Sequence, residues 1–239
     1  MRSIDQLKIA LCFAVLFAFG PVSSVVGQTA IFGVPTTEIH KEKSLYVEAD
    51  FFGHFDKYRD GGFQSYGPSV IYGVNKKLEI GANLYFLHDG ESTAAELEPN
   101  IKWRAYENDE KGVAIAVGTI AYVPLNRAAG SHLTAMFYAN ASKKVGKEKG
   151  PTFTGGIYRV VGGDADFGTR TGALVGLQQP MTEKLTFLAD WTSGKNRFGY
   201  SNIGFGYEVT GSQYLTIGYA IGNSGRGNNY LSAFYGFTF

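Results

Sequence analysis

This chain of 239 residues lacks several features that would place it among common protein classes. It has a single cysteine, at position 12, and an internal disulfide needs two. It has no apolar run of about 20 residues, the length that a membrane-spanning helix requires. Its 22 basic and 21 acidic residues leave a net charge of +1, which argues against a nucleic-acid partner. Zinc-ligand spacings and nucleotide-binding fingerprints are also missing, so we expect no metal site and no cofactor.

The first residues have the layout of a secretory signal peptide. Arg2 and Lys8 precede a short apolar run over 9–19, and small residues follow over 23–27. We expect cleavage near Gly27–Gln28, which makes residues 1–27 a signal peptide. Cys12 falls inside it, so the mature chain would have no cysteine.

After residue 43 the apolar side chains recur with a period of two, which indicates strands rather than amphipathic helices. The clearest stretch is 95–106, where charged and apolar residues alternate strictly. Each stretch is close to the 9–11 residues of a tilted membrane strand. The pattern predicts an all-β protein with twelve strands: 44–54, 63–74, 78–88, 95–106, 112–123, 132–142, 152–161, 171–179, 184–192, 199–209, 214–222 and 229–239.

The connections between these strands alternate in character. The even-numbered ones are short turns, and the odd-numbered ones are longer and rich in glycine or aspartate. This alternation is typical of an antiparallel up-and-down (meander) transmembrane β-barrel, here over residues 44–239. Pro68 and Pro99 lie inside two of the strands. They predict either bulges or shorter strands, and ten strands is the alternative count.

The chain ends on an amphipathic strand with aromatic residues on its apolar face, including Tyr235, Phe237 and Phe239. This ending resembles the C-terminal insertion signal of bacterial outer-membrane β-barrels. The resemblance implies insertion by the barrel-assembly machinery and contact with outer-membrane lipids. It also implies that the protein resides in the outer membrane after export and cleavage of its signal peptide.

The predicted inner faces carry the residues with the most chemistry. They form a candidate pore lining: Glu48, Asp50, Glu79, Glu96, Glu98, Asn100, Lys102, Arg104, Asp190, Tyr200 and Asn202. Charged linings of this kind select small solutes, so the first hypothesis is a narrow pore for small polar solutes. Inward-facing glycines such as Gly176, Gly204 and Gly218 favour free space, or else tight strand packing and curvature.

Two other hypotheses remain. The charges could pair across the lumen and close it, which would give a structural or surface-interaction barrel. A lipid hydrolase would need a Ser–His pair and a third orienting group, and the candidates are His54, His88 and His132 with Ser92 and Ser131. We expect these histidines to be solvated rim residues and the protein not to be an enzyme. Residues 28–43, before the first strand, form either a periplasmic N-terminal segment or a short plug.

Overall fold

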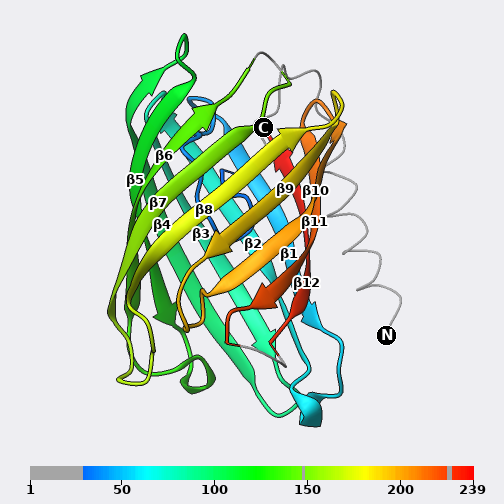
Figure 1. Cartoon of the computed structure of the whole chain (residues 1–239). Coiled ribbons are helices and arrows are strands. Elements are labelled where there is room, and N and C mark those ends of the chain that lie inside the picture. The colour runs from blue at the N-terminus through cyan, green and yellow to red at the C-terminus, as the bar shows by residue number, and fades with distance from the viewer. Residues whose placement is uncertain (1–28, 147–148, 225–227) are drawn as a thin grey trace.

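The computed structural model describes residues 29–146, 149–224 and 228–239; the expected signal peptide lies outside them. The chain forms twelve long strands, which wind around one axis (Figure 1). They are β1 (Leu45–His54), β2 (Phe63–Asn75), β3 (Leu78–His88), β4 (Thr93–Asn108), β5 (Val113–Pro124), β6 (Thr134–Lys144), β7 (Thr152–Gly162), β8 (Thr171–Pro180), β9 (Leu185–Thr192), β10 (Tyr200–Thr210), β11 (Gln213–Gly222) and β12 (Tyr230–Thr238). Two short 3₁₀ turns, η1 (Tyr58–Asp60) and η2 (Arg127–Ala129), lie in odd-numbered connections.

Each strand pairs with its sequence neighbours, and β1 also pairs with β12, so the sheet closes into an antiparallel barrel. The predicted meander with twelve strands is confirmed, and the count of ten is wrong. At the seam the amide of Phe239 donates to Leu45 O at 2.8 Å, and the amide of Leu45 donates to Phe239 O at 3.1 Å. Closure leaves no unpaired edge, as a sheet in lipid requires.

The two prolines interrupt neither strand. Tyr66 pairs with Phe86, and Ser69 pairs with Asn83 in the same register, so β2 runs past Pro68 without a register shift. The register of β4 against β5 is likewise the same on both sides of Pro99. Both predictions for the prolines are therefore wrong. The register shifts lie elsewhere, near the even-numbered turns, between Gly73 and Asn75, Arg104 and Tyr106, and Glu208 and Thr210.

The two faces of the wall differ as the alternation predicts. Large apolar side chains are exposed around the outside, among them Trp103 at 50% and Trp191 at 41%. Inward-facing residues such as Tyr46, Glu79 and Lys102 are buried. An apolar outer belt of this extent is unfavourable in water and favourable in a bilayer. In the described part of the chain, no helix has the length and apolar character to cross a membrane.

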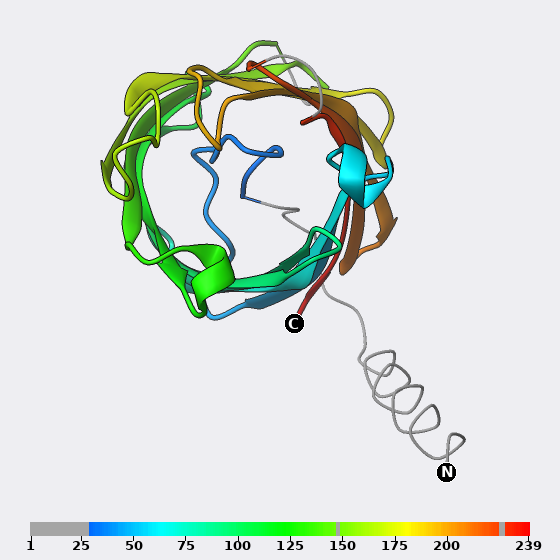
Figure 2. The same cartoon turned by 90° about the horizontal axis from the view of Figure 1, so that it is seen from below.

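Residues 29–43, here called the inner segment, lie inside the barrel. Viewed along the axis in Figure 2, the blue trace of this segment crosses the space enclosed by the strands. Of its residues, Thr29, Ile31, Val34, Thr36 and His40 are each at most 4% exposed. We call the end of the barrel with the odd-numbered connections the loop end, and the end with the even-numbered turns the turn end. The inner segment joins β1 at the turn end, where the Lys43 amide donates to Gly73 O at 2.7 Å.

Candidate functional site: the lumen and its inner segment

The inner segment begins as a tight hairpin. A β-bridge joins Ala30 to Pro35, the Ile31 amide donates to Val34 O at 3.0 Å, and the Thr36 amide donates to Thr29 O at 2.9 Å. The amides at the tip of such a turn point away from the strands and need an acceptor, because buried N–H groups are costly to leave unpaired. That acceptor comes from the wall.

Asp190 on β9 holds the hairpin tip. Its Oδ2 accepts the backbone amides of Phe32 at 2.9 Å, Gly33 at 2.8 Å and Val34 at 2.9 Å. Its Oδ1 accepts the Asn202 amide from β10 at 2.6 Å. The carboxylate thus satisfies a cluster of amides that has no partner within the hairpin. Hydrogen bonds to a charged acceptor are stronger than neutral ones, so Asp190 is a strong anchor for the segment.

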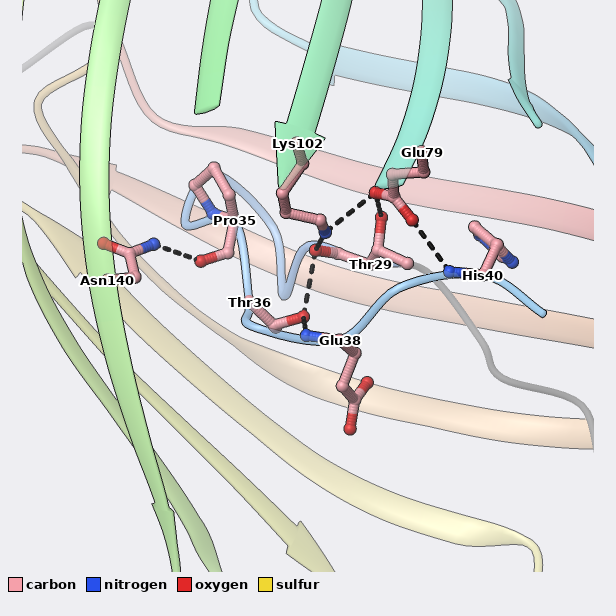
Figure 3. Close-up of polar contacts among 8 residues, drawn as sticks. All are labelled: Thr29, Pro35, Thr36, Glu38, His40, Glu79, Lys102 and Asn140. Carbon is pink, nitrogen blue, oxygen red and sulfur yellow. Dashed lines mark hydrogen bonds and ion pairs between the residues drawn. The ribbon is translucent and has the colours of Figure 1, made fainter. Parts of the chain in front are cut away.

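Glu79 and Lys102 form a second anchor, near the turn end (Figure 3). Lys102 Nζ lies 2.8 Å from Glu79 Oε1, and the two side chains are 4% and 3% exposed. Both also bind the segment. Glu79 accepts Thr29 Oγ1 at 2.7 Å and the His40 amide at 2.8 Å, and Lys102 donates to Thr29 O at 2.8 Å. A buried ion pair needs such extra hydrogen bonds to offset its desolvation.

β6 supplies a third set of contacts. The Asn140 side-chain amide donates to Pro35 O, and Thr37 Oγ1 lies 2.5 Å from Ser142 Oγ. Figure 3 shows Asn140 reaching the segment from the side opposite Glu79. The segment is therefore held from several sides of the wall, by contacts that are all noncovalent.

The wall is shaped to receive apolar side chains of the segment. A Cβ added to Gly176 would collide with Ile31, and one added to Gly218 would collide with the ring of Phe32. At Gly204 the added Cβ would lie 2.8 Å from Phe32 Cζ. These inward glycines therefore do leave space, and the inner segment fills it. Val34 in turn packs into a buried cluster with wall residues Tyr122, Met136, Tyr138, Tyr158, Val160 and Leu174.

Two titratable groups of the segment have shifted pKa values, with opposite consequences. Burial lowers the pKa of His40 to about 4, against the opposing effect of Glu79. The His40 ring stacks on Tyr46 with centroids 4.8 Å apart, and its Nε2 is buried without a hydrogen-bond partner among the described residues. Burial raises the pKa of Glu38, and Lys102, Lys144 and Arg104 partly offset this. We call the inner segment docked in the lumen its seated state. Lowering the pH therefore destabilises the seated state through His40 and stabilises it through Glu38.

On another part of the wall, β1 to β4 carry a row of carboxyl groups. Tyr46 donates to Glu48 Oε2 at 2.6 Å, and Asp50 Oδ2 accepts both Ser69 Oγ and the Tyr85 hydroxyl at 2.5 Å. Asn83 donates to Glu98 Oε2 at 3.2 Å. Glu96 differs, because it receives a bidentate ion pair from Arg197 at 2.5 and 2.9 Å.

The structure places the predicted lining residues as follows. Glu48, Asp50, Glu79, Lys102, Asp190 and Asn202 are buried inside the barrel, and Glu96, Glu98, Asn100, Arg104 and Tyr200 are partly exposed. Of the two basic residues in the predicted lining, Lys102 pairs with Glu79 among the described contacts. Arg104 instead binds Glu107 at 2.6 Å and Lys76 O at 2.8 Å. That these residues line a conducting path stays a prediction.

Two cavities lie on the lumen side of the described residues. The loop-end cavity, of about 400 Å³, is lined by Glu96, His132, Asp164, Lys195 and Arg197 among others. The turn-end cavity, of about 480 Å³, is lined by Glu38, Arg104, Lys144, Glu208 and Tyr214 among others. Both mix acidic and basic groups, so each suits a polar solute rather than an apolar one.

His132, the rim histidine with a serine and an acid beside it, does not form a relay suited to hydrolysis in the described contacts. Ser131 Oγ and Asp164 Oδ1 both contact the same nitrogen, His132 Nδ1, at 3.0 and 2.5 Å. A Ser–His–acid triad uses the two ring nitrogens separately, one for the nucleophile and one for the orienting acid. His132 is also 63% exposed in its side chain, which leaves it in solvent.

Sequence reasoning missed the wall residues whose role is to hold the inner segment, such as Asn140, and also Arg197 at the loop end. The alternating pattern of β6 places Asn140 on the inner face, but it does not predict the contact with the inner segment. Arg197 lies in a loop without a repeating pattern. No signal in the local sequence identifies either contact.

Comparison with known proteins gives a fold and no sequence relative. No protein-family model matches the chain, and no curated protein matches it. Among solved structures, a KdgM porin in complex with disordered oligogalacturonate has a TM-score of 0.57 at 9% identity, covering 82% of this chain and 98% of that one. A second KdgM porin structure has a TM-score of 0.59 at 8% identity, covering 82% and 99%. Outer-membrane phospholipase A from Escherichia coli has a TM-score of 0.48 at 12% identity, covering 84% and 93%.

Proposed function

We propose that this chain, which has the fold of the bacterial outer-membrane β-barrels, is a channel for small polar solutes that its own inner segment keeps closed. In this proposal the loop end faces the outside and the turn end faces the periplasm. The mature protein reaches the outer membrane after export and removal of residues 1–27, and residues 28–43 act as a plug.

The observation that carries the proposal is the fit between the segment and the glycines beneath it. A barrel that is closed for structural reasons alone can fill its lumen with its own wall side chains. Here the wall carries Gly176, Gly204 and Gly218 where the segment packs, so removing the segment would leave open space. The anchors are hydrogen bonds and an ion pair, and such contacts can break and re-form.

The remaining support concerns the solute. The polar cavities at the two ends provide an entry and an exit for a hydrated solute. KdgM porin, which is similar in fold, is described in complex with an oligogalacturonate, a polar solute. At 9% identity this supports the class of solute and not its identity. We propose no catalytic role.

Planar-bilayer recording tests the proposal. The mature protein should conduct rarely or in small steps, and a variant without residues 28–43 should conduct in larger, longer steps. A barrel-fold control, such as heat-modifiable migration in gels, must show that the deletion variant remains folded. If both proteins are folded and silent, and a strain without the gene keeps its normal envelope permeability, the closed structural barrel replaces the channel.

One observation favours that second candidate. Besides the inner segment, a cluster of wall aromatics fills part of the lumen, with Phe52 contacting Tyr85, Tyr230 and Phe234 at centroid distances of 5.3 to 5.7 Å. If this cluster blocks the lumen by itself, deleting the segment will not open it. The bilayer experiment therefore separates the two candidates directly.

A further inference from the structure

The connection between β9 and β10 reaches across the loop end of the barrel. We call its residues, 193–199, the mouth loop. Arg197 in this loop donates from two guanidinium nitrogens to the Glu96 carboxylate on β4, at 2.5 and 2.9 Å. In the closed order of strands, five strands separate β4 from β10 in either direction, so these two strands lie on opposite sides of the barrel. The ion pair therefore joins the two sides across the loop-end opening.

Polar and aromatic contacts hold the mouth loop within that opening. Phe198 packs on Tyr122 of β5 with ring centroids 4.7 Å apart, and the guanidinium of the ion pair lies 5.0 Å from the centroid of the same tyrosine ring. The Asn196 side-chain amide donates to the Tyr158 hydroxyl at 2.9 Å. Both tyrosines belong to the buried cluster that contains Val34 of the inner segment. The mouth loop and the inner segment therefore pack against the same part of the wall.

The mouth loop is held by contacts that can break and re-form. They are noncovalent, and residues 193–199 belong to no strand. Arg197 and Glu96 both line the loop-end cavity, and the Arg197 side chain is 46% exposed. An ion pair in contact with solvent costs less to separate than a buried one. Glycines lie near both ends of the loop, Gly194 with a φ of 102° and Gly199, and small residues often absorb the backbone change at a hinge.

We propose that the mouth loop is a second gate of the channel, at the loop end, and that the Arg197–Glu96 pair is the latch that keeps it closed. This deepens the proposed function and rests on it. A guanidinium suits the task because it can hold a carboxylate with two parallel hydrogen bonds and lie over an aromatic ring at the same time. A solute entering at the loop end meets the mouth loop first and the inner segment second. The latch opens and closes repeatedly, so loss of the inner segment alone still gives current, interrupted by the mouth loop.

Opening of the mouth loop can be measured without any current. Hydrogen exchange of residues 193–199 in the full mature protein, corrected for intrinsic rates, reports how often the loop leaves the wall. Arg197→Gln should speed this exchange about tenfold or more, because the hydrogen bonds between two charged groups are lost. Arg197→Lys keeps the charge without the paired geometry and should give an intermediate rate. Arg59→Gln makes the same charge change at an arginine that is 76% exposed in another connection, and it should leave the rate unchanged. Equal rates in Arg197→Gln and Arg59→Gln would overturn the latch.

A reversible covalent link then tests the gate. Glu96→Cys and Arg197→Cys are introduced into the full mature chain together with Asp190→Asn, which loosens the inner segment. The mature chain would have no cysteine of its own, so only the introduced pair can react. A short bismaleimide with a disulfide in its spacer replaces the ion pair by a covalent link, and a reducing agent later cuts the spacer in the same molecules. We expect the link to abolish the long conductance steps and reduction to restore them. The chain carrying only Asp190→Asn and Arg197→Cys, treated in the same way, should not respond to reduction.

The possible results separate the gate from the channel. Long steps that appear only after reduction support both. Current that is the same before and after reduction, in molecules whose linkage is complete by mass spectrometry, would overturn the gate and leave the channel. Failure of the two thiols to become linked would also overturn the gate, because it would mean that the loop does not meet β4. Silence before and after reduction, in folded protein whose residues 29–37 exchange rapidly, would overturn the channel and the gate with it.

Discussion

Asp190 offers the sharpest test of how the inner segment is held. The change Asp190→Asn keeps the size of the side chain and removes its charge. The asparagine oxygen can still face the amides of Phe32, Gly33 and Val34, and its amide can face Asn202 if that side chain turns over. The wall geometry is thus retained, and the main loss is the charge on the acceptor of the hairpin amides.

The size of the effect follows from those contacts. A hydrogen bond to a charged group contributes about 1.5–3 kcal/mol, and a neutral one about 0.5–1.5 kcal/mol. The difference is about 1 kcal/mol for each of the three amides that Asp190 accepts. The seated state should therefore lose about 3 kcal/mol, which raises the released fraction roughly 100-fold.

A buried cysteine reports that fraction. Val34 is 0% exposed, so Val34→Cys should react with a membrane-impermeant maleimide only when the segment leaves its seat. In this background Asp190→Asn should speed labelling roughly 100-fold. Asp166→Asn, which makes the same charge change on an exposed loop, should not change the labelling rate. Labelling at one rate in both variants, with full reaction after denaturation, would refute the role of Asp190 as an anchor.

Three further changes probe the same equilibrium. The pKa of His40 is about 4 in the seated state and 6.5 when the segment is released, so between these two pH values the released state binds one more proton than the seated state. The seated state is therefore favoured above pH 6.5 and loses about 3 kcal/mol as the pH falls to 4. Hydrogen exchange of residues 29–37, corrected for intrinsic rates, should show this in a Glu38→Gln background, which removes the opposing titration, and His40→Gln should flatten it. Glu79→Gln leaves a buried ammonium without its counterion, a loss of about 3–5 kcal/mol; maleimide labelling should accelerate at least as much as in Asp190→Asn, and an unchanged rate would contradict the anchor. Gly218→Val should expel the segment and raise single-channel conductance, because the valine side chain would occupy the space of the Phe32 ring. Gly155→Val, at a glycine with open space around its Cβ position, should keep the conductance at the parent level.

The wall was largely predictable from the sequence, because strand geometry converts local alternation directly into an inside and an outside. Glu79 and Lys102 could be placed on the inner face, and at the same level, from their strands alone. Arg104 shows where this reasoning weakens. A register shift lies between Arg104 and Tyr106, and the side chain pairs with Glu107 and Lys76 O instead. Alternation does not predict where a bulge will form.

The inner segment could not be placed from the sequence, because its contacts depend on residues far away in the chain. Thr29 meets Glu79, and Gly33 meets Asp190 across a separation of 157 residues. Residues 29–43 have no alternation of their own, so local patterning says nothing of their position. The wall glycines gave a partial signal. They indicated space or close packing, and the structure shows that both occur, since Phe32 packs into the space that Gly204 and Gly218 leave.

The seam between β1 and β12 has a consequence for biogenesis. The strand that the inner segment leads into is the same strand that the C-terminus must find. Once β1 and β12 have paired, the interior can be reached only through the loop end and the turn end. A segment that folds back before zipping can dock sideways through the still-open gap, whereas one that arrives late must thread along the axis. The order of these two events would then set how quickly a newly made chain reaches its final structure, and substitutions that weaken docking would delay assembly as well as loosen the finished protein.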